Sequence, residues 1–185
     1  MGIALADEAA ALGAKVTLVL GPVSLRPSNA AVQTVTVKTA AEMKKASVKA
    51  FRDCDIAILA AAVADFTPET VSGTKIKRGN GEMIIRLKPT EDIAALLGGM
   101  KTGGQFLAGF ALETDDEVSN AISKLKRKNL DMIILNSLRD EGAGFGHETN
   151  RISIIDRNNN IDKFELKTKG EVASDILHKI ISLLH

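Results

Sequence analysis

The 185-residue sequence predicts an α/β fold, because apolar runs typical of strands alternate with Ala-rich or amphipathic segments typical of helices. Runs that are apolar without alternation, the pattern of parallel strands covered on both faces, span residues 15–20, 56–61 and 105–111. Near the C-terminus, two shorter runs flank Asn158-Asn159-Asn160 and indicate an antiparallel hairpin. We therefore expect a Rossmann-like three-layer sandwich with a mostly parallel sheet and an antiparallel C-terminal edge.

The first elements predict the second half of a β-α-β unit. Residues 3–12 are Ala-rich and predict a helix that ends at Gly13. The apolar run 15–20 predicts a parallel strand that ends at Gly21-Pro22. A strand should precede such a helix, so we expect that strand to be missing from the sequence or separated from it.

The middle of the sequence predicts a strand, a helix, a strand, a hairpin and a second helix. These are expected over 32–37, 40–52, 56–61, 75–78 paired with 83–87, and from Thr90 onwards. The hairpin prediction rests on Gly79-Asn80-Gly81, a strong turn signal. Its edges would be exposed, so we expect it to project from the sheet and to pair with a second chain. Thr90, with Glu91 and Asp92 after it, is typical of a helix start.

The last part of the sequence predicts the remaining elements of a single domain. A helix capped by Thr114 or Asp115 follows strand 105–111, and its apolar face comprises Val118, Ala121, Ile122 and Leu125. The expected order is then a strand over 132–135, a glycine-rich loop over 142–146, a hairpin of 151–155 with 161–166, and a helix over 171–184. No repeat or linker divides the chain, so residues 1–185 are expected to form one domain.

Composition excludes several classes of protein. A net charge of +1, with six Phe and neither Trp nor Tyr, argues against nucleic-acid binding and against binding to a membrane surface. Cys54 is the single cysteine, so no internal disulfide can form and a reducing cytoplasm is the expected location. We find no leader segment and no apolar run of membrane-spanning length.

The segment 56–78 carries the first candidate site. Its strand ends in small residues, and Asp65 follows at the edge where parallel strands bind ligands. Lys75, Lys77 and Arg78 then bring positive charge to the same segment, as a phosphorylated or nucleotide ligand would require. Two structural interpretations stay open: Asp65 as a cap or turn residue, and the basic cluster as a solvated face.

Lys124 and Lys128 form a second candidate, since residues one helical turn apart share a face. They could neutralise a polyphosphate, or they could belong to a solvated basic face. The three histidines, His147, His178 and His185, have no metal-ligand spacing, and no glycine fingerprint of a dinucleotide site follows a strand.

Several segments together resemble the phosphopantothenoylcysteine synthetase family. They are Ala-Ala-Ala-Val-Ala-Asp-Phe at 60–66, Lys75-Ile76-Lys77, Thr90-Glu91-Asp92-Ile93, Gly109-Phe110-Ala111-Leu112-Glu113-Thr114, and the segment from Lys124 through Lys128 to Asp131. The resemblance covers nearly the whole chain in the family's order. It implies that Lys75 is catalytic, on a mobile flap, and that the nucleotide site comprises Leu59, Ala60, Ala61, Asp65, Lys75, Glu91, Asp92, Ile93, Ala94, Phe110, Lys124 and Lys128.

The resemblance also implies a reaction and its partners. The family ligates 4′-phosphopantothenate and cysteine in coenzyme A biosynthesis, using CTP with Mg²⁺ and passing through an acyl-cytidylate. It implies a homodimer formed by the hairpin, and in many bacteria fusion to a flavin-dependent decarboxylase. The resemblance also implies a first strand and a Gly/Ser-rich loop just before the position of Gly2, and we expect these to be missing from this sequence or separated from it.

The sequence leaves two rival interpretations of function open. An NAD(P)-binding oxidoreductase could share the fold, but its second strand should end in an acidic residue, and this one ends Leu20-Gly21-Pro22. A catalytically inactive assembly module is the other. The metal ligands and the choice between CTP and ATP are not determined by the sequence.

Overall fold

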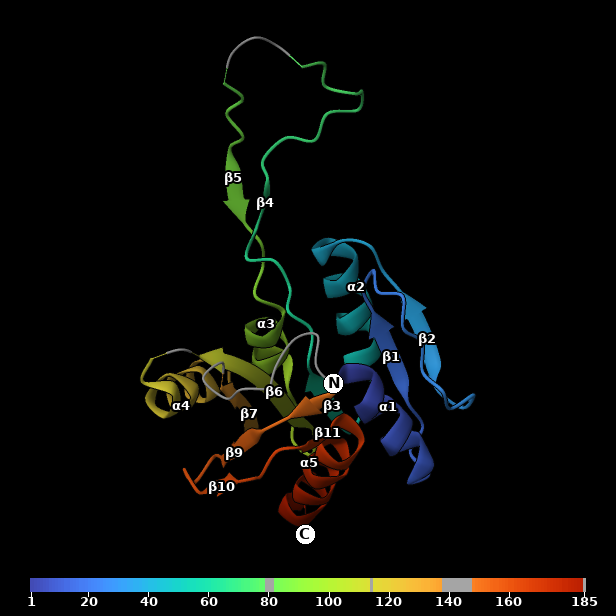
Figure 1. The fold of residues 1–185 in the computed structure, drawn as a ribbon, viewed down its shortest axis with the longest axis vertical. Helices are drawn as coiled ribbons and strands as arrows, with labels where there is room; N and C mark the ends of the chain where they lie inside the picture. Colours follow the sequence, from blue (N-terminus) through green and yellow to red (C-terminus); the bar gives the residue numbers. More distant parts are fainter. Residues whose placement is uncertain (79–81, 114, 138–147, 185) are drawn as a thin grey trace.

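The computed structural model describes residues 1–78, 82–113, 115–137 and 148–184, and these form a three-layer α/β body with a long arm (Figure 1). The helices are α1 (Gly2–Ala11), α2 (Ala40–Phe51), α3 (Ile93–Met100), α4 (Glu117–Arg127) and α5 (Lys169–Leu184). The strands are β1 (Thr17–Leu20), β2 (Gln33–Thr36), β3 (Ile56–Leu59), β4 (Phe66–Pro68), β5 (Leu87–Pro89), β6 (Phe106–Glu113), β7 (Met132–Ser137), β8 (Thr149–Asn150), β9 (Ile152–Asp156), β10 (Ile161–Lys163) and β11 (Lys167–Thr168).

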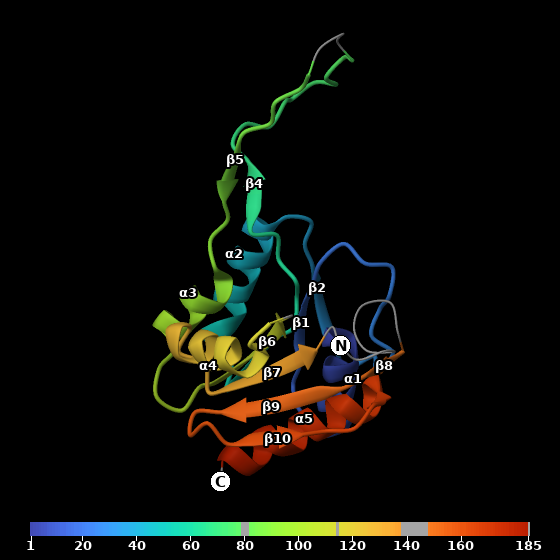
Figure 2. The same ribbon diagram turned by 60° about the vertical axis from the view of Figure 1, so that its left-hand side comes forward.

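The central sheet has five strands in the order β10-β9-β7-β6-β3, and helices cover both of its faces. The pairs β3–β6 and β6–β7 are parallel, whereas β9 and β10 add an antiparallel edge (Figure 2). One core packs α1 and α5 against the sheet, and the second packs α2, α3 and α4 against the opposite face. This arrangement confirms the predicted three-layer fold. No helix of the described residues is both long and apolar enough to span a bilayer.

Two of the strands expected to be fully buried are not. In β3, Ile56 is 38% exposed, and in β1 only Leu20 is buried. β1 pairs with β2 in a separate parallel sheet, and β3 pairs only with β6. The side of β1 away from β2 and the side of β3 away from β6 thus have no partner strand among the described residues. Strands at the end of a sheet are less covered, which explains the exposure.

The projecting hairpin exists, but its paired strands are not those predicted. Strands were expected at 75–78 and 83–87, whereas the antiparallel pair is β4 with β5, close to the body. One further backbone hydrogen bond, Glu69 N to Arg86 O, extends the pairing, and the described residues beyond it have no strand structure. A two-stranded ribbon without a packed face is only marginally stable, so pairing holds near the anchored base. The predicted turn at 79–81 lies outside the described residues.

Three helix starts also differ from the prediction. Asp92, not Thr90, caps α3 by accepting a hydrogen bond from Ala95 N at 3.1 Å. α4 begins after Asp116, not after Asp115, and Thr114 lies outside the described residues. α5 begins two residues early because Thr168 and Glu171 form a reciprocal capping box. The predicted loop at 142–146, His147 and His185 also lie outside the described residues.

The terminal hairpin is confirmed, and a buried carboxylate holds its turn. Asp156 is 3% exposed and accepts hydrogen bonds from Asn158 N and from both the backbone and side-chain nitrogens of Asn160. Asn159 takes the left-handed conformation (φ 62°) that such a turn needs. The turn therefore fixes the antiparallel edge of the sheet.

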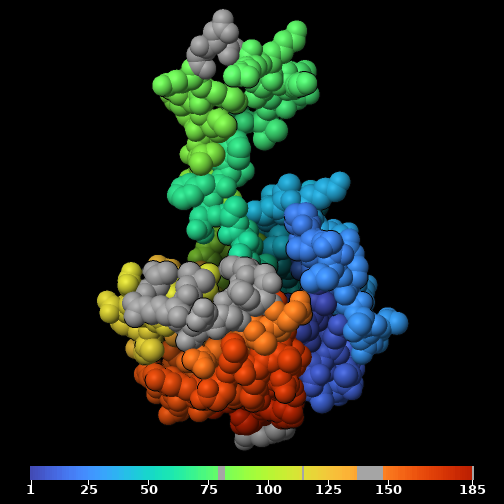
Figure 3. All heavy atoms as spheres, viewed as in Figure 1, coloured from blue at the N-terminus to red at the C-terminus, as the bar shows by residue number. Residues whose placement is uncertain are grey.

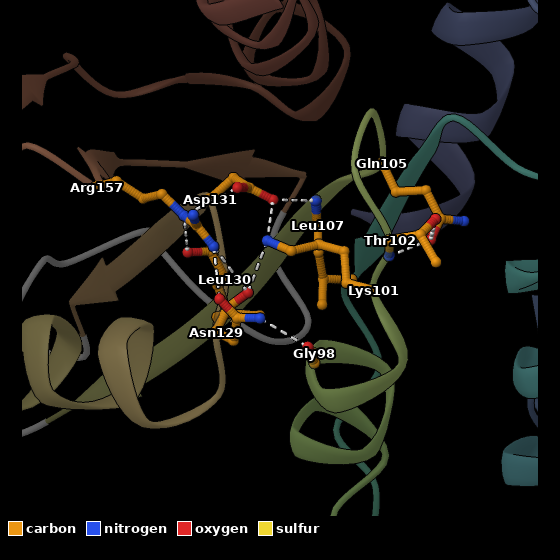
Figure 4. A network of polar contacts seen from close by, with 9 residues as sticks. All are labelled: Gly98, Lys101, Thr102, Gln105, Leu107, Asn129, Leu130, Asp131 and Arg157. Atoms are coloured by element: carbon orange, nitrogen blue, oxygen red, sulfur yellow. Dashed lines mark hydrogen bonds and ion pairs between the residues drawn. The ribbon is translucent and has the colours of Figure 1, made fainter.

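A polar network fixes the ends of α3 and α4 at the amino edge of the sheet (Figure 4). Asp131 Oδ2 accepts from Lys101 Nζ and Leu107 N, each at 2.7 Å, and Asp131 Oδ1 pairs with Arg157 Nε at 2.9 Å. Asn129, in the left-handed conformation, donates from Nδ2 to Gly98 O at 2.7 Å. α3 and the end of α4 are therefore held in direct backbone contact.

Gly98 is the residue that permits this contact. A Cβ at Gly98 would stand 1.9 Å from Lys128 O, whereas a Cβ at the neighbouring Gly99 would meet nothing within 4 Å. The distance at Gly98 is a clash with backbone, which cannot rotate away as a side chain could. The separation of α3 and α4 thus depends on one missing methyl group.

We expect Gly98→Ala to lower the free energy of unfolding by roughly 3 kcal/mol or more, because the α3–α4 contact must open. Gly99→Ala is the matched control, and it should be neutral or stabilising by roughly 0.5 kcal/mol, since Ala favours helix. Urea unfolding followed by circular dichroism measures both variants. Equal stabilities of the two variants would contradict this account of the contact.

Candidate functional site

The carboxyl ends of β3 and β6 and the amino ends of α3 and α4 lie at the same edge of the sheet, from which the arm also rises (Figure 1). Thr90 joins the exit of β3 to the entrance of α3: its Oγ1 donates to Ala64 O at 2.5 Å and its N donates to Asp65 O at 2.8 Å. Thr90, predicted as a helix cap, therefore joins the two ends of the arm where they leave the body. Asp65 itself is exposed at this edge.

Lys128 lies at the end of α4 and reaches back along α3 to that helix's start. Its Nζ is 3.0 Å from Asp92 Oδ2, and the Lys128 side chain is 21% exposed. Asp92 uses its other oxygen to cap α3 through Ala95 N. One carboxylate therefore orders the helix start and holds the lysine beside it.

Lys124 has a carboxylate partner of its own. Its Nζ lies 2.5 Å from Oε1 of Glu113, the last residue of β6, whose side chain is 13% exposed. Glu113 belongs to the segment that carries the family resemblance, but sequence reasoning did not identify it as a site residue. Each of the two candidate lysines is therefore paired with a carboxylate at the carboxyl edge, and their sharing of one binding face stays a prediction.

The charge state of Asp92 follows from its surroundings. Burial raises the pKa of the Asp92 carboxyl, but the hydrogen bond from Ala95 N and the ammonium group of Lys128 oppose it. The net effect lowers the pKa below its ordinary value. Asp92 is therefore a carboxylate at neutral pH, which keeps Lys128 in place.

The remaining predicted residues of α3 lie around this pair. Glu91 forms an ion pair with Lys44 of α2 at 2.7 Å, on the surface. Ile93 packs into the core between α3 and the sheet, and Ala94 is half-buried in the first turn. In this structure Glu91 and Ile93 thus have structural partners, and Asp92 is the member of the group that contacts a candidate lysine.

The residues at the end of β3 lie on both faces of the sheet. Leu59 packs toward α2, α3 and α4, whereas Ala60 packs toward α1 and α5, and Ala61 is exposed. Phe110 of β6 is half-buried on the same face as Ala60. A ligand lying across these strand ends could reach backbone groups of Leu59 and Ala60 and the ring of Phe110.

Lys75 is not brought to the other predicted residues. It is exposed on the arm, which stands clear of the body in the space-filling view (Figure 3). The arm is continuous with the carboxyl edge at its base only. Lys75 can therefore act at this edge only if the arm bends or if a second chain brings the residue there.

The described residues contain no group of three or more His, Cys, Asp or Glu side chains arranged to hold a metal ion. Asp92 and Glu113, the carboxylates nearest the candidate lysines, are each engaged in an ion pair.

Comparison with known proteins places the whole chain in one family's pattern. The family described as "DNA/pantothenate metabolism flavoprotein C-terminal domain" matches residues 1–184. A relative from an unknown prokaryotic organism, named cysteine/cysteine sulfinic acid decarboxylase, is 75% identical over all of this chain and 52% of its own length. The coenzyme A biosynthesis bifunctional protein CoaBC of Bacillus subtilis is 42% identical over 99% of this chain and 45% of its own length.

Solved structures agree with this pattern. The crystal structure of the C-terminal domain of coenzyme A biosynthesis bifunctional protein CoaBC superposes with a TM-score of 0.82 at 38% identity. It covers 99% of this chain and 83% of that one. The chain spans about half the length of the curated relatives it matches.

Because the folded-state pKa of Asp92 is lowered, its contribution to stability is present above the unfolded pKa of about 4 and is lost as the pH falls below it. We expect Asp92→Asn to keep the cap, since Asn caps as well as Asp, and to lose the pairing with Lys128. The stability difference between parent and variant should shrink from pH 7 to pH 3 in urea unfolding.

The same substitution at the exposed Asp53 controls for the loss of one negative charge. A difference between parent and Asp92→Asn that stays constant across this pH range would show that the carboxylate is not held as described.

Proposed function

Because this chain belongs to the DNA/pantothenate metabolism flavoprotein C-terminal domain family, we propose that it is a ligase domain of coenzyme A biosynthesis that joins 4′-phosphopantothenate and cysteine. The observation that carries the proposal is the carboxyl edge, where Lys124 pairs with Glu113 at the end of β6 and Lys128 pairs with Asp92 at the start of α3. Relatives named for this pathway at 38–42% identity support it.

The proposed reaction has two steps, each with a defined leaving group. A carboxylate oxygen of 4′-phosphopantothenate attacks the α-phosphorus of CTP, and pyrophosphate leaves as the acyl-cytidylate forms. The cysteine amine then attacks the acyl carbon, loses a proton, and expels CMP as the amide bond forms. The first step concentrates negative charge, so cationic side chains near the phosphates would stabilise it.

Lys124 and Lys128 would exchange their carboxylate partners for phosphate oxygens when CTP binds. Glu113 and Lys128 are only 13% and 21% exposed, so contacts of similar strength must replace each pair, and the charged phosphate oxygens would supply them. Asp65 would accept hydrogen bonds from the ribose hydroxyls, and backbone groups of Leu59, Ala60 and Ala61 would read the base. Phe110 would wall the pocket on the other face of the sheet.

Mg²⁺ fits this site as an ion that the triphosphate brings with it. Mg²⁺ commonly binds through substrate phosphates and one or two carboxylates, and here no preformed cluster of the described residues competes with that mode. When bound, the ion would neutralise phosphate charge. Asp92 or Glu113, once released by its lysine, would be the available protein oxygen.

The arm supports a homodimeric enzyme. Large apolar side chains exposed along it include Phe66, Val71, Ile76, Met83, Ile84, Ile85 and Leu87, with Val71 86% and Ile84 85% exposed. Several large exposed apolar side chains on one projecting segment are typical of an interaction site. Pairing of two arms around a two-fold axis would bury these residues and could carry Lys75 to the carboxyl edge of the partner.

A second candidate function has its own observation. The relative that is 75% identical is named a decarboxylase, and this chain covers 52% of it. The chain could therefore be a non-catalytic half that supports decarboxylation of cysteine or cysteine sulfinate elsewhere in a longer protein. In that case the residues of the proposed nucleotide site would not support catalysis by this chain.

One experiment separates the two candidates. The protein is incubated with CTP, Mg²⁺, 4′-phosphopantothenate and cysteine, and CMP is measured, with cysteine sulfinate and carbon dioxide release as the parallel assay. Cysteine-dependent CMP formation supports the ligase. Carbon dioxide without CMP from a longer protein that contains this chain would favour the decarboxylase half.

We expect Lys128→Ala to raise the Kd for CTP about tenfold or more, because a charged hydrogen bond to phosphate is worth roughly 1.5–3 kcal/mol. Lys126→Ala, on the exposed side of the same helix, is the control and should bind CTP like the parent. Isothermal titration measures both. Parent-like binding by Lys128→Ala would favour the solvated-face interpretation of this lysine.

We expect Lys75→Gln to abolish pyrophosphate release while leaving the Kd for CTP within about twofold, since the arm lysine would act in the transition state only. Lys77→Gln on the same arm is the matched control. Release of pyrophosphate from Lys75→Gln at the parent rate would remove Lys75 from the catalytic role.

We expect Ile85→Lys to convert a dimer into monomers in light scattering, because a charge cannot be buried between two arms without a partner. Leu25→Lys, at an apolar residue that is 69% exposed away from the arm, should stay dimeric. A parent that is monomeric at micromolar concentration would rule out the dimer.

A further inference from the structure

A groove lined by basic side chains on α2 has no part in the site described above. It is lined by six residues of α2 and its C-cap: Ala41, Lys44, Lys45, Val48, Lys49 and Arg52. Their spacing of three and four residues places all six on one side of the helix. The opposite side faces the body: Phe51 is buried in the core, and Met43 Cε would lie 3.5 Å from a Cβ at Gly21. The groove therefore lies on the outer face of α2.

Three of the four cations in the groove, Lys45, Lys49 and Arg52, are exposed, and no described residue forms an ion pair or side-chain hydrogen bond with them. Glu42, the acid within α2, accepts from a backbone N–H at the start of the helix instead. Asp53 and Asp55 come after the helix, and neither forms an ion pair with Arg52. Like charges one helical turn apart repel each other and slightly destabilise a helix. Carboxylates from another molecule would remove that repulsion.

The fourth cation shows that a carboxylate fits at the side of this groove. Lys44 Nζ lies 2.7 Å from Oε2 of Glu91, which reaches it from the residue before the cap of α3. Beyond this pair the groove has an apolar component, because half-buried Val48 and the small Ala41 lie among the cations. A ligand that matches the groove therefore carries carboxylates and an apolar side chain.

The shape of the groove favours a protein ligand over a small molecule. Sites for small molecules enclose most of the ligand surface, whereas Ala41, Lys45 and Lys49 are exposed to solvent. A nucleic acid would leave the apolar residues without a contact, and no aromatic side chain lines the groove for a base to stack on. The groove runs along about three turns of α2, and the ridge of a second helix packs into a groove of this kind.

We propose that this face of α2 is a docking surface for an acidic helix of a partner protein. Carboxylates one turn apart on that helix pair with Lys45, Lys49 and Arg52, and an apolar residue between them packs on Val48. Each ion pair on an exposed face contributes little free energy and is screened by salt, so the contact is weak and transient. The inference goes beyond the proposed ligase and does not depend on it.

Two synthetic helical peptides of identical composition test the match. In the first, glutamates at every third or fourth position and one leucine share a face; in the second, the same residues are spread around the helix. We expect the first peptide to bind at least about fivefold more tightly by fluorescence anisotropy at 50 mM salt, and to weaken at 200 mM salt. Equal affinities of the two peptides, or no binding of the first at millimolar concentration, would overturn the inference.

The double variant Lys45→Glu, Lys49→Glu locates the contact. It should weaken binding of the first peptide at least about tenfold, because two attractions become repulsions. A peptide with lysines in place of the glutamates should bind this variant more tightly than it binds the parent, which shows that the variant is folded and its face intact. The double variant Lys15→Glu, Lys163→Glu, at exposed lysines on other elements, is the matched control and should bind the first peptide within about twofold of the parent.

Backbone amide shifts in a nitrogen–proton correlation spectrum of the parent map the surface that the first peptide covers. We expect them on α2 and at the start of α3, and not on the arm, which is also basic. Shifts confined to the arm, or parent-like binding by the Lys45→Glu, Lys49→Glu variant, would refute the docking surface. A 15-base-pair DNA duplex that binds α2 more tightly than the peptide would also overturn the inference and assign this face to nucleic acid.

Discussion

The backbone contact between α3 and the end of α4 is the constraint on which the candidate nucleotide site depends. The carbonyl group of Lys128 lies against Gly98 of α3, and the ammonium group of the same lysine reaches the candidate site. There it pairs with Asp92, the residue that caps the start of α3. The Asp131 network holds this contact at the amino edge, far along the helices from the ligand edge. The contact at the C-terminal ends of α3 and α4 therefore sets the position of the Lys128 ammonium group at the N-terminal end of α3.

The order of elements could be predicted from the sequence, because period and turn residues are local signals. The two-sided core and the terminal hairpin followed from them. The arm could not be predicted in detail: the sequence around Gly79-Asn80-Gly81 favours a hairpin, but nothing local fixes where a ribbon without a packed face stays paired. Burial of β3 was also overestimated, since an apolar run does not reveal whether both neighbours are present.

Individual residues of the candidate site could be predicted from the sequence, but the ion pairs that they form could not. Lys124 and Lys128 were identified from spacing and resemblance, but their partners come from β6 and from the cap of α3, which only the tertiary fold brings near. Asp92 displaced Thr90 as the cap because Thr90 is used between β3 and α3.

The two lysine–carboxylate pairs suggest how the lysines of the candidate site are held in one conformation. Uncompensated ammonium groups side by side would repel each other and take up many rotamers, and a polyphosphate would then have to order them as it binds. Paired with Glu113 and Asp92, each lysine is already held in one place before a polyphosphate binds. The released carboxylates would next face a phosphate, which is unfavourable unless a cation lies between them. The Mg²⁺ ion proposed to accompany CTP would supply that cation and make the carboxylates compatible with a phosphate ligand.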